Sequence, residues 1–254
     1  MNNKKIIIIA GGHGLLGSEF AYTLSKDDSN EVIILDLPNK KINRLIKKTR
    51  FFPCDVGDEE DVQTTIDQIY DNYGRIDTLI NCAAYNEQPD ASIDNSFENY
   101  SLSRWNDRLS VNLNGAFLLS RECIKYMLKN KNEGFRGTIM NVTSQLGLVA
   151  PNQTIYNRGY KKPIAYCVAA SGIISMTRYL ASYYGSKIKI NCLIPSMVEN
   201  GQAEEFIKNV EKLIPIGRMS KKEEFNSAMK FLCSEDSSYM TGQILVCDGG
   251  YTSW

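Results

Sequence analysis

The feature of this sequence that most limits its possible folds is an apolar run followed at once by closely spaced glycines. Residues 6–10 are a short, mostly β-branched run of the kind found in buried strands. Gly11, Gly14 and Gly17 come next, and a helical pattern of apolar residues begins directly after them. Strand, glycine turn and helix in this order let backbone N–H groups approach a pyrophosphate at a helix N-terminus. An ordinary turn between strand and helix is the alternative, because a glycine motif alone is not specific.

Strands and helices alternate along the rest of the chain. We expect strands at residues 31–35, 78–80, 137–144 and 189–195, helices at residues 58–73, 103–129 and 166–180, and a closing strand within residues 238–250. Such alternation is typical of an α/β protein with a doubly wound parallel sheet, the Rossmann fold. No repeat, linker or low-complexity run interrupts it, so the sequence predicts a single domain over residues 1–254.

The charge balance and the apolar runs argue against several classes of protein. Lysine and arginine total 29, and aspartate and glutamate also total 29, so no basic surplus favours nucleic acid as a partner. The early apolar run is far too short for a signal or membrane span, and we expect a cytoplasmic protein without a membrane partner. No two cysteines have metal-ligand spacing, so we expect no metal site. We expect the cysteines to be reduced residues of the core; they are Cys54, Cys82, Cys123, Cys167, Cys192, Cys233 and Cys247.

A serine and a tyrosine stand out between residues 144 and 170. Ser144 closes an expected buried strand, and Tyr166 opens an expected amphipathic helix whose apolar positions include Val168 and Ile173. Four residues are about one helical turn, so position 170, which is Ala170, shares a face with the tyrosine. Taken alone, this pattern indicates that Tyr166 is an aromatic residue of the core or of an interface.

Further motifs lie in the order that a known family has. They are Asp55-Val56, Asn81-Cys82-Ala83-Ala84, Val111-Asn112-Leu113, Pro195-Ser196 and Asp248-Gly249-Gly250. Together with Ser144 and Tyr166, they resemble the short-chain dehydrogenase/reductase family over nearly the whole chain. The resemblance implies a dinucleotide-binding oxidoreductase domain. Cys82, Ala84 and Ser196 depart from the family pattern.

The resemblance also assigns catalytic roles. It implies that Tyr166 is the general acid/base at the substrate oxygen, that Ser144 orients this oxygen, and that Asn112 distorts its helix and holds a relay water. A lysine in the family stands at position 170, where this chain has Ala170. A turn asparagine, a polar residue on a helix flank and a solvated loop aspartate remain the alternatives for individual motif residues.

The resemblance implies NAD as the cofactor, with NADP disfavoured. Asp36 follows the second expected strand, where a carboxylate accepts the adenosine ribose hydroxyls and repels a 2′-phosphate. The glycine spacing fits the family's extended branch. Most members of the shorter branch have a glycine at the position that Leu15 occupies in this chain. The other implied contacts are Gly11, His13, Gly14, Leu15, Leu16, Gly17, Asp55, Val56, Asn81, Ala83, Tyr166 and Val198.

Three segments are similar to those of flagellin-modification oxidoreductases from legionaminic-type sugar pathways. They are residues 177–185, the ending 248–254, and an insert at 152–163 that is longer than the family usually has. This similarity implies an aminosugar or sugar-phosphate substrate. A 3-oxoacyl or small-ketone reductase and a non-catalytic NAD-binding protein are the alternatives. The insert's aromatic and basic residues suit an anionic or carbohydrate substrate, a solvated flap or a subunit contact.

The resemblance further implies a mobile substrate lid at residues 199–215 and a homotetramer, or at least a dimer. The tetramer would pair the fourth and fifth helices of the fold. The residues that we expect at this interface are Phe117, Leu118, Met127, Ile174, Tyr179 and Tyr183.

Ala170 leads us to expect weak NAD binding and poor turnover. The family lysine binds the nicotinamide ribose and lowers the pKa of the tyrosine, and an unperturbed tyrosine is ionised in only about one molecule in a thousand at pH 7. Lys161 or Lys162 can substitute only if the insert folds back over the site. The alanine is either a substitution made at this position or a feature of an inactive relative.

Overall fold

A seven-stranded parallel sheet runs through the protein. The computed structural model describes residues 4–38, 48–86, 94, 96–131, 134–156 and 160–254. The strand order is β3-β2-β1-β4-β5-β6-β7, so the order reverses between β1 and β4. The strands are β1 (Lys5–Ala10), β2 (Asn30–Asp36), β3 (Thr49–Pro53), β4 (Thr78–Asn81), β5 (Gly137–Val142), β6 (Ile188–Pro195) and β7 (Ile244–Cys247). The expected doubly wound α/β fold is confirmed.

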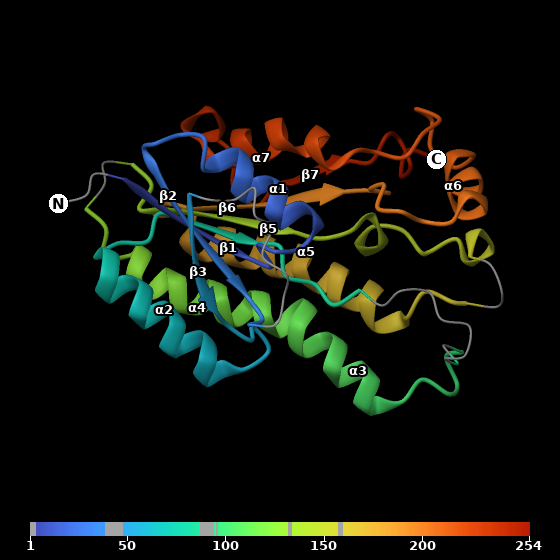
Figure 1. The fold of residues 1–254 in the computed structure, drawn as a ribbon, viewed down its shortest axis with the longest axis horizontal. Helices are drawn as coiled ribbons and strands as arrows, with labels where there is room; N and C mark the ends of the chain where they lie inside the picture. Colours follow the sequence, from blue (N-terminus) through green and yellow to red (C-terminus); the bar gives the residue numbers. More distant parts are fainter. Residues whose placement is uncertain (1–3, 39–47, 87–93, 95, 132–133, 157–159) are drawn as a thin grey trace.

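Helices cover both faces of this sheet. Figure 1 shows α2 and α4 on one side and α1 and α7 on the opposite side. The helices are α1 (Leu15–Leu24), α2 (Glu59–Tyr73), α3 (Leu102–Leu109), α4 (Gly115–Met127), α5 (Ile164–Tyr184), α6 (Glu204–Glu211) and α7 (Asn226–Cys233). α5 packs on β6 on the same side as α4.

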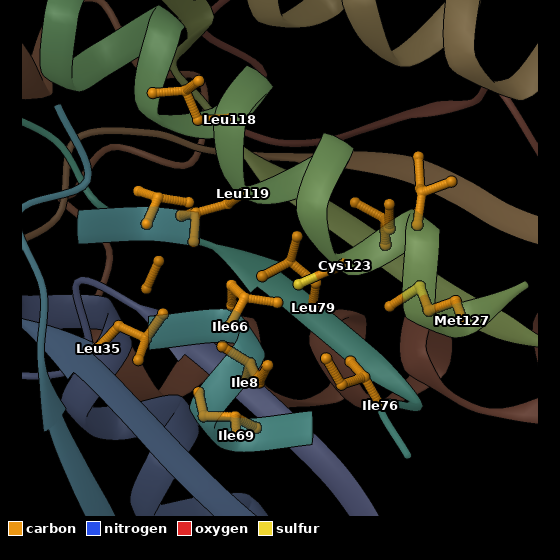
Figure 2. Close-up of a cluster of buried hydrophobic side chains, with 14 of the residues drawn as sticks. Ile8, Leu35, Ile66, Ile69, Ile76, Leu79, Leu118, Leu119, Cys123 and Met127 are labelled. Atoms are coloured by element: carbon orange, nitrogen blue, oxygen red, sulfur yellow. The ribbon is translucent and has the colours of Figure 1, made fainter. Parts of the chain in front are cut away.

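The strands are apolar on both faces because both faces are buried. Ile8 of β1 packs with α2 and α4, whereas its neighbours Ile7 and Ile9 pack with α1 and α7 on the other face. Figure 2 shows the first of these clusters, where Ile66 from α2 and Cys123 from α4 meet above the sheet. This double-sided packing fixes the carboxyl ends of the strands, where the candidate site residues lie.

The long helix that we expected at residues 103–129 is interrupted. α3 ends at Leu109, a π-helical turn follows at Ser110–Asn114 (η1), and α4 begins at Gly115. The Gly115 N–H donates to the Ser110 carbonyl five residues earlier, which is the π-helical spacing. Asn112 lies in the middle of this turn, so the expected local distortion of the helix is present.

Of the two apolar positions that we named on the helix of Tyr166, Ile173 is buried and Val168 is exposed. The other buried side chains of α5 include Ala169, Ala170 and Thr177. α5 is also the one helix among the described residues that is long and apolar enough to cross a membrane by length and composition. The same description fits a helix in the core of a soluble protein, and α5 packs against β6 and η1.

The cysteines have free thiols. Cys54, Cys123 and Cys192 are buried, as we expected for core residues, and the other four are half-buried. Burial raises the pKa of Cys54 to about 12, because the thiolate would lose its hydration there. A thiol in such surroundings is chemically inert, so we assign these cysteines no chemistry.

Candidate active site

The candidate residues gather at the carboxyl edge of the sheet. Gly11 follows β1, Asp36 ends β2, Asn81 ends β4, Ser144 lies just after β5, and Ser196 follows β6. In open parallel sheets, ligands bind beyond this edge at the point where the strand order reverses, which is here between β1 and β4.

The glycine loop after β1 has no room for side chains. Gly11 has φ +72°, and a Cβ there would lie 2.6 Å from Cα of Ala83. A Cβ on Gly17 would lie 2.1 Å from the Gly11 carbonyl oxygen. Gly14 begins α1 without any side-chain cap, and Leu15 and Leu16 form the first turn. The half-buried backbone of this loop and the N-terminus of α1 therefore form a cradle that fits a pyrophosphate.

Asp36 ties this loop to the second strand. The His13 N–H donates to one carboxylate oxygen at 3.0 Å, and the Leu37 N–H donates to the other at 2.9 Å. A carboxylate has about four lone-pair sites, so two donors leave acceptor capacity for ribose hydroxyls. The His13 ring packs beside the ring of Phe51 from β3, 4.8 Å between centroids.

The Asp55-Val56 pair lies in the turn between β3 and α2. The Asp55 carboxylate accepts from the Gly57 N–H at 2.9 Å. The backbone N–H of Asp55 donates to the Asp61 carboxylate at 2.7 Å. Val56 is buried, and a Cβ on Gly115 would lie 2.9 Å from its side chain. The pair thus joins this turn to the start of α4.

Asn81 uses its side chain for the fold. Its Nδ2 donates to Asn141 Oδ1 at 2.8 Å and to Ser120 Oγ at 3.1 Å, and all three side chains are buried. Asn141 Nδ2 then donates to Thr177 Oγ1 of α5 at 2.9 Å. The side chain of Asn81 therefore points into a polar network between β4, β5, α4 and α5. Both side-chain N–H donors are used in this network, whereas the buried Oδ1 accepts no hydrogen bond from the described residues.

Asn112 fixes the loop after β4. Its Oδ1 accepts from the Tyr85 N–H at 2.6 Å, and its Nδ2 donates to the Tyr85 carbonyl at 3.1 Å. The Arg108 guanidinium lies over the Tyr85 ring, 4.1 Å from its centroid. Both polar atoms of the Asn112 side chain are thus engaged with Tyr85, which leaves the backbone of η1 to hold the expected relay water.

Ser144 and Tyr166 lie together. Ser144 comes two residues after the end of β5, so the strand is shorter than we expected, and it caps the short turn Gln145–Gly147. Its hydroxyl can donate to Gln145 Oε1 at 3.0 Å or to the Tyr166 phenol oxygen, and one proton serves one acceptor at a time. Burial raises the pKa of Tyr166, and the hydrogen bond from Ser144 lowers it in part.

Ala170 lies one turn beyond Tyr166 and is buried. Its carbonyl accepts from Thr143 Oγ1 at 3.4 Å, and its backbone packs so closely on Gly147 that a Cβ there would lie 2.8 Å away. Ala170 therefore helps to hold the turn that carries Ser144. Its methyl side chain supplies neither a charge nor a hydrogen-bond donor to the site.

The insert brings a lysine to the tyrosine. Lys162 Nζ lies 3.9 Å from the centroid of the Tyr166 ring and donates to Asn86 Oδ1 at 2.7 Å. Lys161 is exposed, whereas Tyr160 is buried. A solvated flap is therefore a wrong interpretation for Tyr160 and Lys162, and insert residues 157–159 lie outside the described residues. Residues 87–93 and 95 also lie outside the described residues.

Val198 lies in the segment after β6. It forms an isolated parallel bridge with Ser220, and its carbonyl accepts from Gln202 Nε2 at 2.9 Å. Met197 before it has φ +47°, a left-handed conformation that is uncommon for a residue with a side chain. Ser196 stands where the family has a glycine, and its side chain is buried.

No group of metal-ligating side chains gathers anywhere in the described parts of the chain.

Comparisons with known proteins agree with this geometry. The family model described as enoyl-(acyl carrier protein) reductase matches residues 16–252. The chain is 28% identical to a 3-oxoacyl-(acyl-carrier-protein) reductase of Thermotoga maritima, over 97% of each protein. It is 33% identical to a D-threitol dehydrogenase of Mycolicibacterium smegmatis, over 80% of this chain and 73% of that protein.

A solved structure is similar over almost the whole chain. It is a short-chain dehydrogenase from Leptospira borgpetersenii with bound NAD+, 31% identical, with a TM-score of 0.86 over 98% of this chain and 93% of that one. An aldohexose dehydrogenase from Thermoplasma acidophilum, at 23% identity and a TM-score of 0.82, shares the fold over all of this chain and 96% of its own.

Proposed function

This chain belongs to the short-chain dehydrogenase/reductase family of NAD(P)-dependent oxidoreductases, and we propose that it transfers a hydride between NAD(H) and a hydroxyl or carbonyl carbon of a sugar. The observation that carries the proposal is the Ser144–Tyr166 pair, which lies at the same sheet edge as the glycine cradle. The proposed substrate is an aminosugar or sugar phosphate of surface-glycan or flagellin-modification biosynthesis, handled in the cytoplasm.

The reaction removes a proton and a hydride from a substrate alcohol. A bound nicotinamide would supply the acceptor for the hydride of the alcohol carbon. Tyr166, as phenolate, takes the hydroxyl proton and becomes a neutral phenol while the C–O bond becomes a carbonyl. Ser144 donates a hydrogen bond to the substrate oxygen and so holds it beside the phenol. The reverse direction uses the same groups, with Tyr166 as the acid.

The cofactor proposal rests on the loop between β1 and α1 together with Asp36. Gly11, Gly14 and Gly17 hold the backbone where a pyrophosphate fits, and the carboxylate of Asp36 lies beside this loop. A carboxylate at the end of the second strand favours the free ribose hydroxyls of NAD over the 2′-phosphate of NADP. Asp55, Val56, Ala83 and Val198 complete the proposed contacts.

The sugar proposal draws its support from the insert. Tyr156 packs on Tyr160 at 5.2 Å and on Phe206 of α6 at 5.7 Å between ring centroids. Aromatic walls with a few polar groups suit a small polar substrate that also has apolar faces. The D-threitol dehydrogenase is a relative that acts on a polyol. Phe206 lies in the expected lid at residues 199–215, so the lid already contacts the insert in this structure.

A 3-oxoacyl thioester reductase is the second candidate. The Thermotoga relative carries that activity in its name and matches 97% of this chain, and the family model carries the name of an acyl-carrier-protein reductase. Against it, the insert places the buried Tyr160 within electrostatic range of Tyr166. A thioester substrate needs an open path for its pantetheine arm, and a large aromatic side chain near the tyrosine would narrow that path.

Substrate panels separate the two candidates. We would follow NADH absorbance with the purified chain and aminosugar phosphates, nucleotide sugars, polyols and 3-oxoacyl thioesters. The sugar proposal expects turnover of at least one sugar or polyol, with a loss of at least about a hundredfold in Tyr166→Phe. Turnover confined to thioesters would favour the second candidate. Binding of NAD with no turnover of any substrate would favour the non-catalytic alternative.

A further inference from the structure

Position 170 leaves the tyrosine without the cation that the proposed reaction requires. Tyr166 must lose its proton to act as the base, and burial opposes the loss because a phenolate is poorly solvated there. Ala170 adds no charge. A positive group close to the ring is therefore needed. The need for this charge follows from the proposed function, so the inference rests on that function.

Lys162 is held at the tyrosine ring by neutral partners. Its N–H donates to Gln153 Oε1 at 2.9 Å, which fixes the backbone of the insert beside the turn Gln153–Ile155. Its Nζ donates to Asn86 Oδ1 at 2.7 Å and lies 3.9 Å from the Tyr166 ring centroid. No carboxylate in the described parts of the chain forms an ion pair with this ammonium. Its charge is thus available to the tyrosine.

We propose that the Lys162 ammonium supplies, from the insert, the positive charge beside Tyr166 that position 170 lacks. A cation over the ring face is attracted to the electron-rich face of the neutral phenol. The attraction grows when the phenol ionises, because part of the negative charge then spreads into the ring. Lys162 acts through Tyr166 and touches no reacting atom, so it is a positioning residue for the proton transfer.

The groups around Lys162 decide at which pH it is charged. Burial lowers the pKa of Lys162 to about 8, the thiol of Cys167 opposes this shift, and the like charge of Arg108 adds to it. At pH 7, a lysine with that pKa is protonated in about nine molecules of ten. The other groups facing it are Tyr166 and the neutral amide of Asn86. The ammonium therefore keeps its charge at neutral pH and loses it above about pH 8.

The sequence signal for this arrangement is present but incomplete. The insert carries two adjacent lysines just before the helix of Tyr166, and either one satisfies the chemical requirement. The structure distinguishes them, since Lys161 is exposed and Lys162 lies over the ring. Lys161 is therefore the matched control for Lys162.

The test measures the ionisation of Tyr166 directly. The full chain is made with isotopically labelled tyrosine, and the Tyr166 NMR signal is assigned by its loss in Tyr166→Phe and followed during a pH titration. Because Lys162 loses its charge near pH 8, before the buried phenol titrates, the Tyr166 signal of the parent should show a step near pH 8 that is absent from Lys162→Met. Lys162→Arg, which keeps its charge throughout the titration, should lower the pKa of Tyr166 below that of the parent by about one unit or more. Lys161→Met should leave both features as they are in the parent.

Activity is the second readout. Once a turned-over substrate is known, Lys162→Met should lower kcat/KM about tenfold and move the basic limb of the kcat profile, while Lys161→Met should not. An unchanged Tyr166 titration in folded Lys162→Met overturns the proposal, and so does a rise in KM alone, which would assign Lys162 to substrate binding. If Lys162→Met unfolds, the titration of Lys162→Gln decides by the same criterion. Because the titration needs no turnover, its result still tests the role of Lys162 if no substrate of the proposed reaction is turned over.

Discussion

At the scale of single residues, burial moves the two key pKa values in opposite directions. It raises the pKa of Tyr166 and lowers the pKa of Lys162 to about 8, because each charged form loses hydration in the same place. The hydrogen bond from Ser144 acts against the first shift, and in our proposal the charge of Lys162 over the ring does so as well. The proposed base therefore depends on two side chains from separate segments, one after β5 and one before α5.

The first prediction concerns the dependence of stability on pH. The folded pKa of Lys162 lies below its unfolded value, so between about pH 8 and pH 10.5 the unfolded chain binds more protons. Its contribution to the free energy of unfolding should thus rise with pH across this window and stay constant below it. Denaturant unfolding of the parent and of Lys162→Met should show the parent gaining relative to the variant from pH 8 to pH 10. Parallel pH profiles would contradict the assignment.

The second prediction concerns the choice of cofactor. Asp36 would meet a 2′-phosphate with like charge, so the chain should bind NAD more tightly than NADP, by about tenfold or more. Asp36→Asn should narrow this preference because the repulsion is removed, while the amide oxygen can still accept one of the two backbone hydrogen bonds, from His13 or from Leu37. Calorimetric titration with both nucleotides measures the ratio. Equal or tighter binding of NADP by the parent would contradict the prediction.

The third prediction concerns Ala170→Lys. A lysine there would bind the nicotinamide ribose and add a second charge near Tyr166, so kcat/KM should rise at least about tenfold, the equivalent of one pKa unit. The gain should be larger in the Lys162→Met background, where no other cation is left. Ala170→Met is the control for bulk without charge. No gain on any sugar or ketone substrate would favour the non-catalytic alternative.

At the scale of elements, two local features join the helices to the sheet beneath the site. The π-helical turn η1 lets Asn112 reach the Tyr85 backbone, which fixes the loop after β4. The network of Asn81, Asn141 and Thr177 fixes β4 and β5 to α5. Both features hold the helix of Tyr166 in place relative to the strand that precedes Ser144.

The fourth prediction tests this network. Asn141 is fully buried, and Asn141→Ala would leave the Thr177 hydroxyl and one donor of Asn81 with one partner fewer. We expect a loss of about 2–4 kcal/mol in the free energy of unfolding, from the cavity and the unsatisfied polar groups. Asn200→Ala, at an exposed position, is the control and should change it by less than about 0.5 kcal/mol. A loss below about 1 kcal/mol in Asn141→Ala would contradict the prediction.

At the scale of the whole molecule, aromatic side chains remain exposed on the outer helices. Tyr179 and Tyr183 of α5 are 67% and 69% exposed, and Phe117 of α4 is 48% exposed. The expected interface was wrong for Leu118, Met127 and Ile174, which are buried in the core of the same chain. We retain the proposal of a homotetramer, or at least a dimer, on the exposed residues alone. The single domain over residues 1–254 also stays a prediction.

The fifth prediction follows from this surface. Light scattering at micromolar concentration should give a mass of at least twice 28.6 kDa. Charges in place of apolar contacts are costly at an interface, so Tyr179→Glu with Tyr183→Glu should lower the mass toward the monomer. Tyr239→Glu is the control, because Tyr239 is fully exposed outside α4 and α5. A parent that is monomeric at this concentration would contradict the proposal.

The sequence by itself determined the fold and the order of the motifs. Buried strands must be apolar on both faces, and the loop after β1 admits only glycine at Gly11 and Gly17, so both leave direct marks in the sequence. Spacing within one helix placed position 170 one turn after Tyr166. The resemblance to the family, rather than periodicity, implied Ser144 and Tyr166 as partners and Ala170 as a missing cation.

Only the tertiary structure decided which side chains meet. Lys161 and Lys162 are chemically equivalent in the sequence, and the path of the insert places Lys162 alone over Tyr166. Leu118 and Ile174 have the same apolar character whether they face the core or a partner, and packing buries them. The sequence leaves open whether the side chain of Asn81 faces a cofactor. In the structure, Asn141 and Ser120 accept hydrogen bonds from its Nδ2 group. Contacts between distant segments depend on how the elements pack, and a single residue's identity does not record that.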